Sequence, residues 1–212
     1  MEDKPTIKIT KCTDESLVRL AASYTMGRES KITLKRAYKS EHSIIRTQLF
    51  AIESRNIPLF VSTHLIRHHV GSQPFQLTCR EDLTKNPTFK AHIDTLRDEI
   101  VAGDIDKAVA HLEWIESHFD RYTPVNLLIF ANAQSLIDMA KLRLCFKASV
   151  QTREWFGRIK EELKSADPDL YPYLVPKCVY RGGICCEPKC CGYNKTDLFK
   201  KALDNYKLLF VD

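Results

Sequence analysis

The 212-residue sequence lacks a long apolar run, so no segment of it is expected to cross a bilayer as a helix. It has no low-complexity tract and no internal repeat, which argues against a disordered chain and against a repeat array. It also lacks a block of like charge, because the net charge of +5 is spread along the whole length. Such a charge suits an anionic ligand without demanding nucleic acid, and we expect neither a membrane nor nucleic acid as a partner.

The first residues lack the basic, then apolar, then small-residue pattern of a secretory signal. We therefore expect a cytoplasmic protein whose thiols stay reduced. The apolar content of 44% and the charged content of 28% are those of a soluble globular protein with one good core. We expect a main domain over residues 1–175 and a cysteine-rich extension, packed on it, over residues 176–212.

Hydrophobic patterns predict a protein of the α/β (α+β) class, in which strands are combined with long helices. Strands are predicted at residues 7–12 and 43–56, and extended chain again at residues 75–80. The run 125–146 is apolar almost all round and holds neither Pro nor Gly, so it is predicted to be one buried central helix. The other predicted helices cover residues 14–25, 58–69, 89–103, 104–119 and 147–164.

One short stretch, HLIRHHVGSQPFQLTCRED at residues 64–82, gathers two arginines, three histidines and a cysteine. His64 and His68 are four positions apart on a predicted helix, which is the spacing of a pair of metal ligands. Arg67 and Arg80 are fork-shaped cations that suit a phosphate or another anion. A solvated helix end, whose basic side chains complement the negative pole of the helix, accounts for the same residues. The sequence leaves the three interpretations open.

Cysteine is abundant, with eight in the chain. The pattern Cys-x6-Cys-Cys-x3-Cys-Cys offers more than the four thiolates of a tetrahedral zinc site, but it lacks a clean pair of CxxC motifs. Three interpretations of these cysteines remain open: a structural metal such as zinc, a disulfide or redox use, and reduced thiols in a packed loop. The candidate metal ligands are Cys178, Cys185, Cys186, Cys190 and Cys191.

Three stretches, in order, resemble the flavin-dependent thymidylate synthases (ThyX). Residues 64–81 resemble the family signature, with Arg67, His68 and Ser72 at matching positions. SEHSIIRTQLFAIES at residues 40–54 resembles the family's strand that begins with Glu-His. NAQSLIDMAKLR at residues 132–143 resembles its NARSLxNFLxLR helix. The resemblance implies a ThyX-like fold with an antiparallel or mixed sheet and long helices. It also implies that residues 1–175 form the catalytic domain, and that the protein is a homotetramer.

The resemblance also implies roles for individual residues. Arg143 would be catalytic, because the family uses an Arg there to stabilise the charge that builds on the pyrimidine ring. The residues implied to bind the cofactor are His42, Arg67, His68, His69, Asn132, Ala133, Gln134 and Asp138. Those implied to bind the substrate are His64, Arg67, Gln76, Thr78, Arg80 and Arg143.

Several positions depart from the family pattern. Phe75, Leu77 and Cys79 stand where the family has Glu, Ser and Arg that grip the nucleotide, although a shift by one residue would let Arg80 replace that Arg. Gln134 stands in place of an Arg that contacts the flavin. A neutral amide cannot reproduce the charge-assisted hydrogen bonds of that Arg, each worth about 1.5–3 kcal/mol.

The implied activity is methylation of deoxyuridine monophosphate at C5, with methylenetetrahydrofolate as donor, FAD as cofactor and NADPH as reductant. The altered residues leave two alternatives open. One is a relative with a changed reaction, such as hydroxymethylation or use of a deoxycytidine nucleotide. The other is a non-catalytic protein that binds nucleotide or flavin. In each case a pyrimidine deoxynucleotide is the expected ligand.

Overall fold

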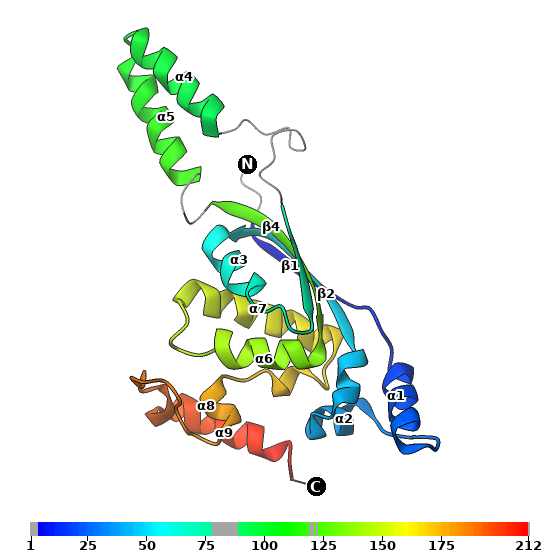
Figure 1. Ribbon diagram of the computed structural model, residues 1–212. Helices are drawn as coiled ribbons and strands as arrows, with labels where there is room; N and C mark the ends of the chain where they lie inside the picture. Colours follow the sequence, from blue (N-terminus) through cyan, green and yellow to red (C-terminus); the bar gives the residue numbers. More distant parts are fainter. Residues whose placement is uncertain (1–3, 78–88, 119–120, 122, 212) are drawn as a thin grey trace.

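A computed structural model of the chain describes residues 4–77, 89–118, 121 and 123–211 (Figure 1). Within them an antiparallel sheet of four strands has the order β1-β2-β4-β3, so the strand latest in the chain lies inside the sheet. The strands are β1 (Thr6–Lys11), β2 (Leu49–Pro58), β3 (Ser72–Gln76) and β4 (Pro124–Asn132).

Helices occupy much of the remaining described chain. Those before β4 are α1 (Ser16–Met26), α2 (Leu34–Ser40), the 3-10 helix η1 (Ser43–Thr47), α3 (Leu59–Ile66), α4 (Phe89–Val101) and α5 (Ile105–His118). Those after it are α6 (Ala133–Arg143), α7 (Val150–Ala166), η2 (Tyr171–Tyr173), α8 (Lys177–Tyr180), η3 (Tyr193–Lys195) and α9 (Asp197–Leu208). The predicted class of helices with an antiparallel sheet is confirmed.

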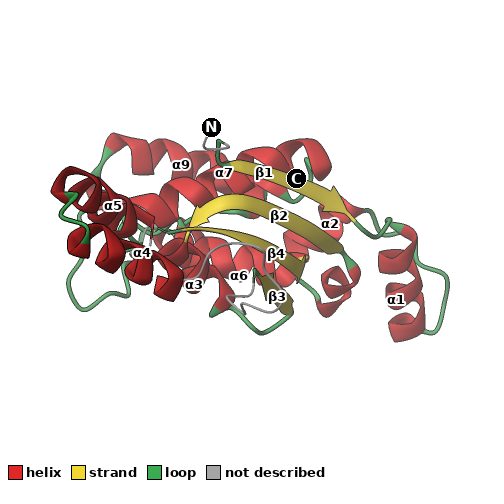
Figure 2. Ribbon diagram, turned by 90° about the horizontal axis from the view of Figure 1, so that it is seen from above, coloured by secondary structure: helices red, strands yellow, loops and turns green. Residues whose placement is uncertain are grey.

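The sheet has one buried face and one more exposed face. Along β4 the residues Val125, Leu127, Ile129 and Ala131 are buried, because alternate side chains of a strand point to the same side. Figure 2 shows α3, α6 and α7 on one side of the sheet. On the opposite face, Phe75 of β3 and Leu77 just after it are exposed, and the exposed fraction of Phe75 is 54%. The core therefore lies between the sheet and these helices.

The prediction of one helix over residues 125–146 was wrong. The first part of this run is β4, and only residues 133–143 form a helix, α6. A strand and a helix that are each buried on most sides both appear as continuous apolar sequence, so periodicity could not separate them. Asn132 marks the change, because its side-chain Oδ1 accepts a hydrogen bond from the backbone N–H of Ser135 at 2.9 Å and caps α6. The strand predicted from residue 43 likewise begins only at Leu49, after η1.

The C-terminal residues belong to the same core as the sheet. Val179, Phe199 and Tyr206 are buried in the cluster that includes β2, β4 and α6. A buried carboxylate ties other parts together: Asp167 Oδ2 accepts from Lys11 Nζ at 2.7 Å and from the Tyr38 hydroxyl at 2.8 Å. This network joins β1, α2 and the end of α7.

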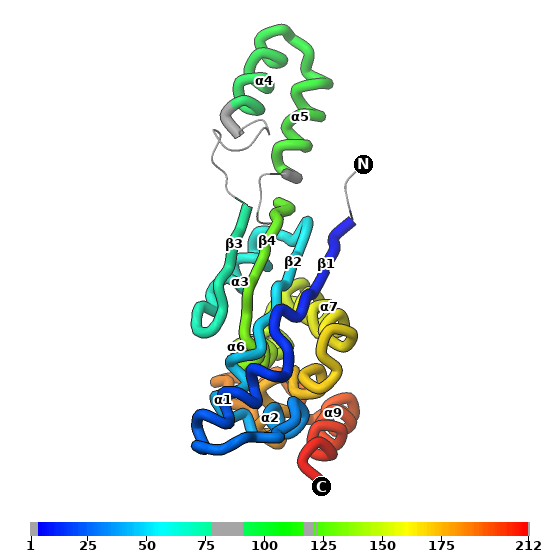
Figure 3. Tube along the Cα trace, turned by 90° about the vertical axis from the view of Figure 1, so that its right-hand side faces the viewer, coloured from blue at the N-terminus to red at the C-terminus, as the bar shows by residue number. Residues whose placement is uncertain are grey.

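The helices α4 and α5 pack on each other as a hairpin beyond one end of the sheet, away from α6, α8 and α9 (Figures 1 and 3). Within the part of the chain that is described, none of the helices is long and apolar enough to cross a membrane.

Candidate functional site

The centre of the candidate site is a contact between Arg143, the last residue of α6, and His68, the second residue after the end of α3. Arg143 Nε donates a hydrogen bond to His68 Nε2 at 2.8 Å. Ser72 at the start of β3 holds the other side of this turn, since its hydroxyl donates to the backbone carbonyl of His68. Two segments far apart in the sequence, residues 68–72 and the end of α6, thus fix the guanidinium of Arg143.

His68 is neutral in this position. Burial, and then the positive charge of Arg143, lower the pKa of His68 to about 4, although the charge of Asp138 acts in the opposite direction. Because Nε2 accepts the bond from Arg143, the proton of the neutral ring is on Nδ1. The imidazole therefore positions a cation without adding a second positive charge.

Arg67 and His64 complete an electropositive cluster. Burial, and then the charge of Arg67, lower the pKa of Arg143. Burial, followed by the charges of Arg143 and Arg67, also lowers the pKa of His64, whose Nδ1 lies 2.8 Å from Thr152 Oγ1. The positive charges of the two arginines repel each other, and an anion bound between them would relieve that repulsion.

A groove beside Arg143 extends this basic surface. It has a volume of about 200 Å³ and is lined by the cations Lys141, Arg143, Lys147 and Lys177, with Glu187 on the same wall. Such a set of charges suits a phosphate or pyrophosphate group. Arg143 therefore has a neutral histidine on one side and a basic groove on the other.

Gln134 lies in a network with the charged side chains of Glu41, Asp138 and Lys141, of which only Asp138 was predicted as a site residue. Its amide Nε2 lies 3.4 Å from Glu41 Oε2 and 3.5 Å from Asp138 Oδ2. Lys141 Nζ is 3.0 Å from Asp138 Oδ1 and 3.7 Å from Glu41 Oε2, and it stacks 3.7 Å above the ring of Tyr180. A cation, Lys141, thus stands about two turns along α6 from Gln134, the position where the family has its Arg.

These contacts stabilise the charged form of Lys141. Burial by itself would lower its pKa, but the hydrogen bond with Asp138 and the charges of Glu41 and Asp138 outweigh burial and raise it. Glu41 was not among the predicted site residues, although it belongs to the Glu-His pair that carries the resemblance. That pair was the signal that could have identified it.

Asn132 and Ala133 stabilise the start of α6. Ala133 is fully buried, and its backbone N–H donates to Gln48 O at 2.9 Å. The backbone N–H of Asn132 donates to Gly71 O at 2.9 Å, while its side chain caps the helix. A Cβ at Gly71 would stand 2.6 Å from Asn132 Nδ2. The close approach of these two segments therefore requires glycine.

The remaining predicted residues are distributed unevenly around the cluster. His69 follows His68 and is exposed, with Nδ1 3.1 Å from Arg67 O. Gln76 accepts a hydrogen bond from the Ser62 hydroxyl at 2.6 Å. His42 is exposed and lines a different cavity, with side chains of α1 and α2. Thr78 and Arg80, like Cys79, lie outside the described residues.

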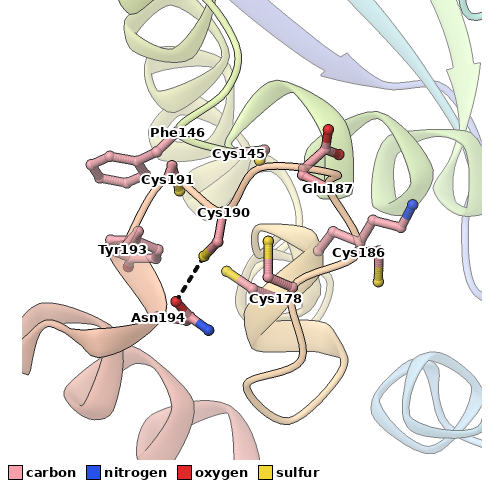
Figure 4. Close-up of a pocket in the computed structure, with 11 residues that line it drawn as sticks. Cys145, Phe146, Cys178, Cys186, Glu187, Cys190, Cys191, Tyr193 and Asn194 are labelled. Carbon is pink, nitrogen blue, oxygen red and sulfur yellow. Dashed lines mark hydrogen bonds between the residues drawn. The ribbon is translucent and has the colours of Figure 1, made fainter.

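The cysteine-rich loop forms a second cavity, drawn in Figure 4. Cys178, Cys185, Cys190 and Cys191, four of the predicted ligands, line it, and Cys145 joins them from just beyond α6. Cys186 also borders the cavity, but its sulfur points away from the others and lies near the Arg181 guanidinium (Figure 4). Within the described residues no group of three or more His, Cys, Asp or Glu side chains is arranged to hold a metal ion. The predicted zinc site is not formed by the side chains as they stand.

Comparison with known proteins identifies similar sequences and folds. A flavin-dependent thymidylate synthase from Sulfurisphaera tokodaii is 25% identical over 159 residues, a match that covers 65% of this chain and 58% of that protein. The chain thus spans less than two thirds of this relative's length. No family model matches the chain.

Two solved structures share the architecture. A UMP/dUMP methylase, PolB from Streptomyces cacaoi bound with 5-Br dUMP, superposes with a TM-score of 0.53 at 13% identity, covering 81% of this chain and 94% of that one. Thymidylate synthase X from Helicobacter pylori, with FAD and dUMP, gives a TM-score of 0.51 at 15% identity, and the match covers 82% of this chain and 99% of that one.

The sheet, its helices and these neighbours define the ThyX fold. The chain is similar in sequence to a flavin-dependent thymidylate synthase and shares the fold of the two solved structures, as the resemblance of the three sequence stretches implied.

Proposed function

We propose that this protein is a flavin-dependent enzyme that methylates deoxyuridine monophosphate at C5, with methylenetetrahydrofolate as one-carbon donor and NADPH as reductant. The observation that carries the proposal is the Arg143 guanidinium, held at 2.8 Å by a neutral His68 at the edge of a basic groove. The similarity to a thymidylate synthase supports the same reaction class.

The role of Arg143 follows from its geometry. The contact with His68 uses Nε, so the two Nη groups of the fork can address a planar ligand that carries negative charge. In the proposed reaction that ligand is the pyrimidine ring, on whose oxygen and N3 charge builds as C5 becomes nucleophilic. A permanent cation fixed beforehand stabilises this charge without rearrangement during the reaction.

The residues present fit a bound flavin. Lys141, Lys147 and Lys177 line the groove and would hold the pyrophosphate of FAD, and the exposed Arg67 and His69 would meet it from the turn after α3. Lys141 would take the place of the cation lost at Gln134. FAD would supply the redox chemistry when bound, while the protein binds and orients both ligands.

A changed reaction is the second candidate, and one observation favours it. Phe75 is 54% exposed and Leu77 is 46% exposed, on the strand where the family has the Glu and Ser that grip the nucleotide. Apolar side chains cannot replace those hydrogen bonds. Use of a deoxycytidine nucleotide, a hydroxymethylated product, or binding without catalysis would each be compatible with this surface.

Tritium release from nucleotides labelled at C5 tests the function. Purified protein would be supplied with FAD, NADPH, methylenetetrahydrofolate and either labelled dUMP or labelled dCMP, and the product would be identified by mass spectrometry. We expect release from dUMP and a methylated product. The variant Arg143→Lys should lose most of the release, whereas Arg158→Lys, on α7 where Nη2 donates to Pro5 O, should keep it.

We further propose the homotetramer that the resemblance implies. The exposed side chains of β3 supply an open sheet face on which a second copy could pack. Light scattering on the purified protein would measure the mass, and four chains per particle are expected.

A further inference from the structure

The cysteine cavity is not used by the proposed reaction. Cys145 comes from the segment that follows α6, while Cys178 lies in α8 and the others follow it. Figure 4 shows the sulfurs of Cys145, Cys178, Cys190 and Cys191 around one space, and Cys185 lines the same cavity. These five residues are called the thiol cluster below. Sequence spacing alone would not have connected Cys145 with the other four.

The loop that carries the cluster is shaped by glycine and by hydrogen bonds to sulfur. Gly192 has a φ of +84° and donates its backbone N–H to Cys190 Sγ at 3.4 Å. Asn194 lies on the other side of Cys190, with Oδ1 3.2 Å from its sulfur, and donates Nδ2 to Gly183 O at 3.0 Å. A backbone N–H aimed at sulfur stabilises the thiolate form of a cysteine. The loop is thus organised around its sulfur atoms.

Aromatic side chains close one side of the cavity. The rings of Phe146 and Tyr193 stack with centroids 4.1 Å apart and planes inclined by 10°, and the Arg153 guanidinium covers Phe146 at 4.4 Å. Phe146 is the neighbour of Cys145, and Tyr193 closely follows Cys191. The stack therefore fastens the cysteine-rich loop to the end of α6 and keeps the two groups of thiols together.

The composition of the cavity suits a thiophilic metal, because the five thiols of the cluster border one space. A thiophilic metal would displace the protons of such thiols to solvent and bind the thiolates. Sulfur ligands select zinc or iron–sulfur centres over hard cations such as magnesium.

We propose that the thiol cluster is a binding site for a thiolate-ligated metal centre, whose ligands are drawn from Cys145, Cys178, Cys185, Cys190 and Cys191. Cys186 is not a ligand. No three metal-binding side chains of the described residues are yet in coordinating positions. Binding therefore draws the exposed Cys190 and Cys191 toward the half-buried Cys145 and Cys178, a movement that their glycine-containing loop permits.

Metal and sulfide analysis tests this site. The full-length protein would be purified under inert gas, incubated with either zinc or ferrous iron plus sulfide, and desalted. We expect near-stoichiometric metal: zinc without sulfide identifies a single ion, and iron with a matching amount of acid-labile sulfide identifies a cluster. Either result supports the site, whereas a protein that keeps neither would overturn it.

Two single substitutions and one matched control test the ligand set. Cys145→Ser and Cys178→Ser should lower metal affinity by more than the about 10- to 100-fold that loss of an outer-shell partner costs. Cys186→Ser, in the same loop, should leave metal binding unchanged. Equal loss in all three variants would contradict the assignment.

Titration of the unmodified protein with cobalt(II) gives a test that does not depend on whether the variants fold. Sulfur-to-cobalt charge-transfer absorption is expected, and its absence would count against thiolate ligation. None of these readouts requires flavin or nucleotide, so they test the metal site independently of the proposed reaction.

Discussion

Arg143 Nε and His68 Nε2 lie 2.8 Å apart, and this hydrogen bond joins the end of α6 to the turn after α3. The donor carries a permanent charge and the acceptor is neutral, because the pKa of His68 is lowered to about 4. The pair therefore presents one oriented cation to the groove. The neighbouring Arg67 and Lys141 add to its attraction for anions.

Replacing His68 should separate the role of the hydrogen bond from that of the ring. His68→Ala removes the acceptor, so Arg143 should lose its orientation and nucleotide binding should weaken by about 1.5–3 kcal/mol. His68→Gln can still accept the bond and should recover much of that loss. Calorimetric titration with dUMP measures both. Identical affinities for the two variants would mean that His68 does not act through Arg143.

The same histidine predicts how stability depends on pH. Its pKa is lowered to about 4 in the folded chain, against 6.5 for an ordinary histidine, so the unfolded chain binds the extra proton first. Its stabilising contribution is complete above pH 6.5 and is lost as the pH falls toward 4. We expect the contribution of His68 to the free energy of unfolding to be about 1–2 kcal/mol smaller at pH 5 than at pH 7. Urea unfolding of wild type and His68→Gln at both pH values measures the difference, which should shrink in the variant.

The buried carboxylate of Asp167 should be the most sensitive ionised group in the core. Its side chain is 1% exposed and binds both Lys11 and Tyr38. Asp167→Asn leaves the partly buried Lys11 without its counter-charge and should cost about 3–5 kcal/mol of unfolding free energy. Asp197→Asn is the control, because that side chain is 96% exposed, and it should change stability by less than about 0.5 kcal/mol. A mild effect at Asp167 would contradict the network.

Gly71 should not tolerate alanine. Its φ is +73°, and a Cβ would lie 2.6 Å from Asn132 Nδ2, so Gly71→Ala adds backbone strain and displaces the cap of α6. We expect a loss of about 2–3 kcal/mol together with weaker ligand binding. Gly27→Ala has a similar φ of +64° but nothing within 4 Å of the new Cβ. Thermal unfolding of the two variants isolates the contribution of the contact, and equal losses would rule it out.

The resemblance to a known family drew attention to Arg67, His68 and Arg143, whose role in a site stays a prediction. The structure places Arg143 beside His68 although the two lie on distant segments. The run 125–146 was misread because a buried strand followed by a buried helix has no polar face to reveal its period. Only Asn132, as a helix cap, contained the information on where one ends and the other begins.

Contacts between distant segments could not be predicted from spacing. Cys145 is separated from Cys178 by the whole of α7, so its place in the thiol cluster depends on how α6 and α8 pack. Lys141, which faces Glu41 from across the site, was hidden for the same reason. Local patterns report single elements, whereas these pairs are set by tertiary packing.

A visible absorption spectrum tests the central claim most directly. Protein would be mixed with FAD, desalted and measured before and after addition of dUMP, with Arg143→Lys as the comparison. We predict an oxidised-flavin spectrum that survives desalting and shifts with dUMP in the wild type, and a much smaller nucleotide-induced shift in the variant. A protein that comes through desalting colourless, with or without the nucleotide, would contradict a flavin-dependent function.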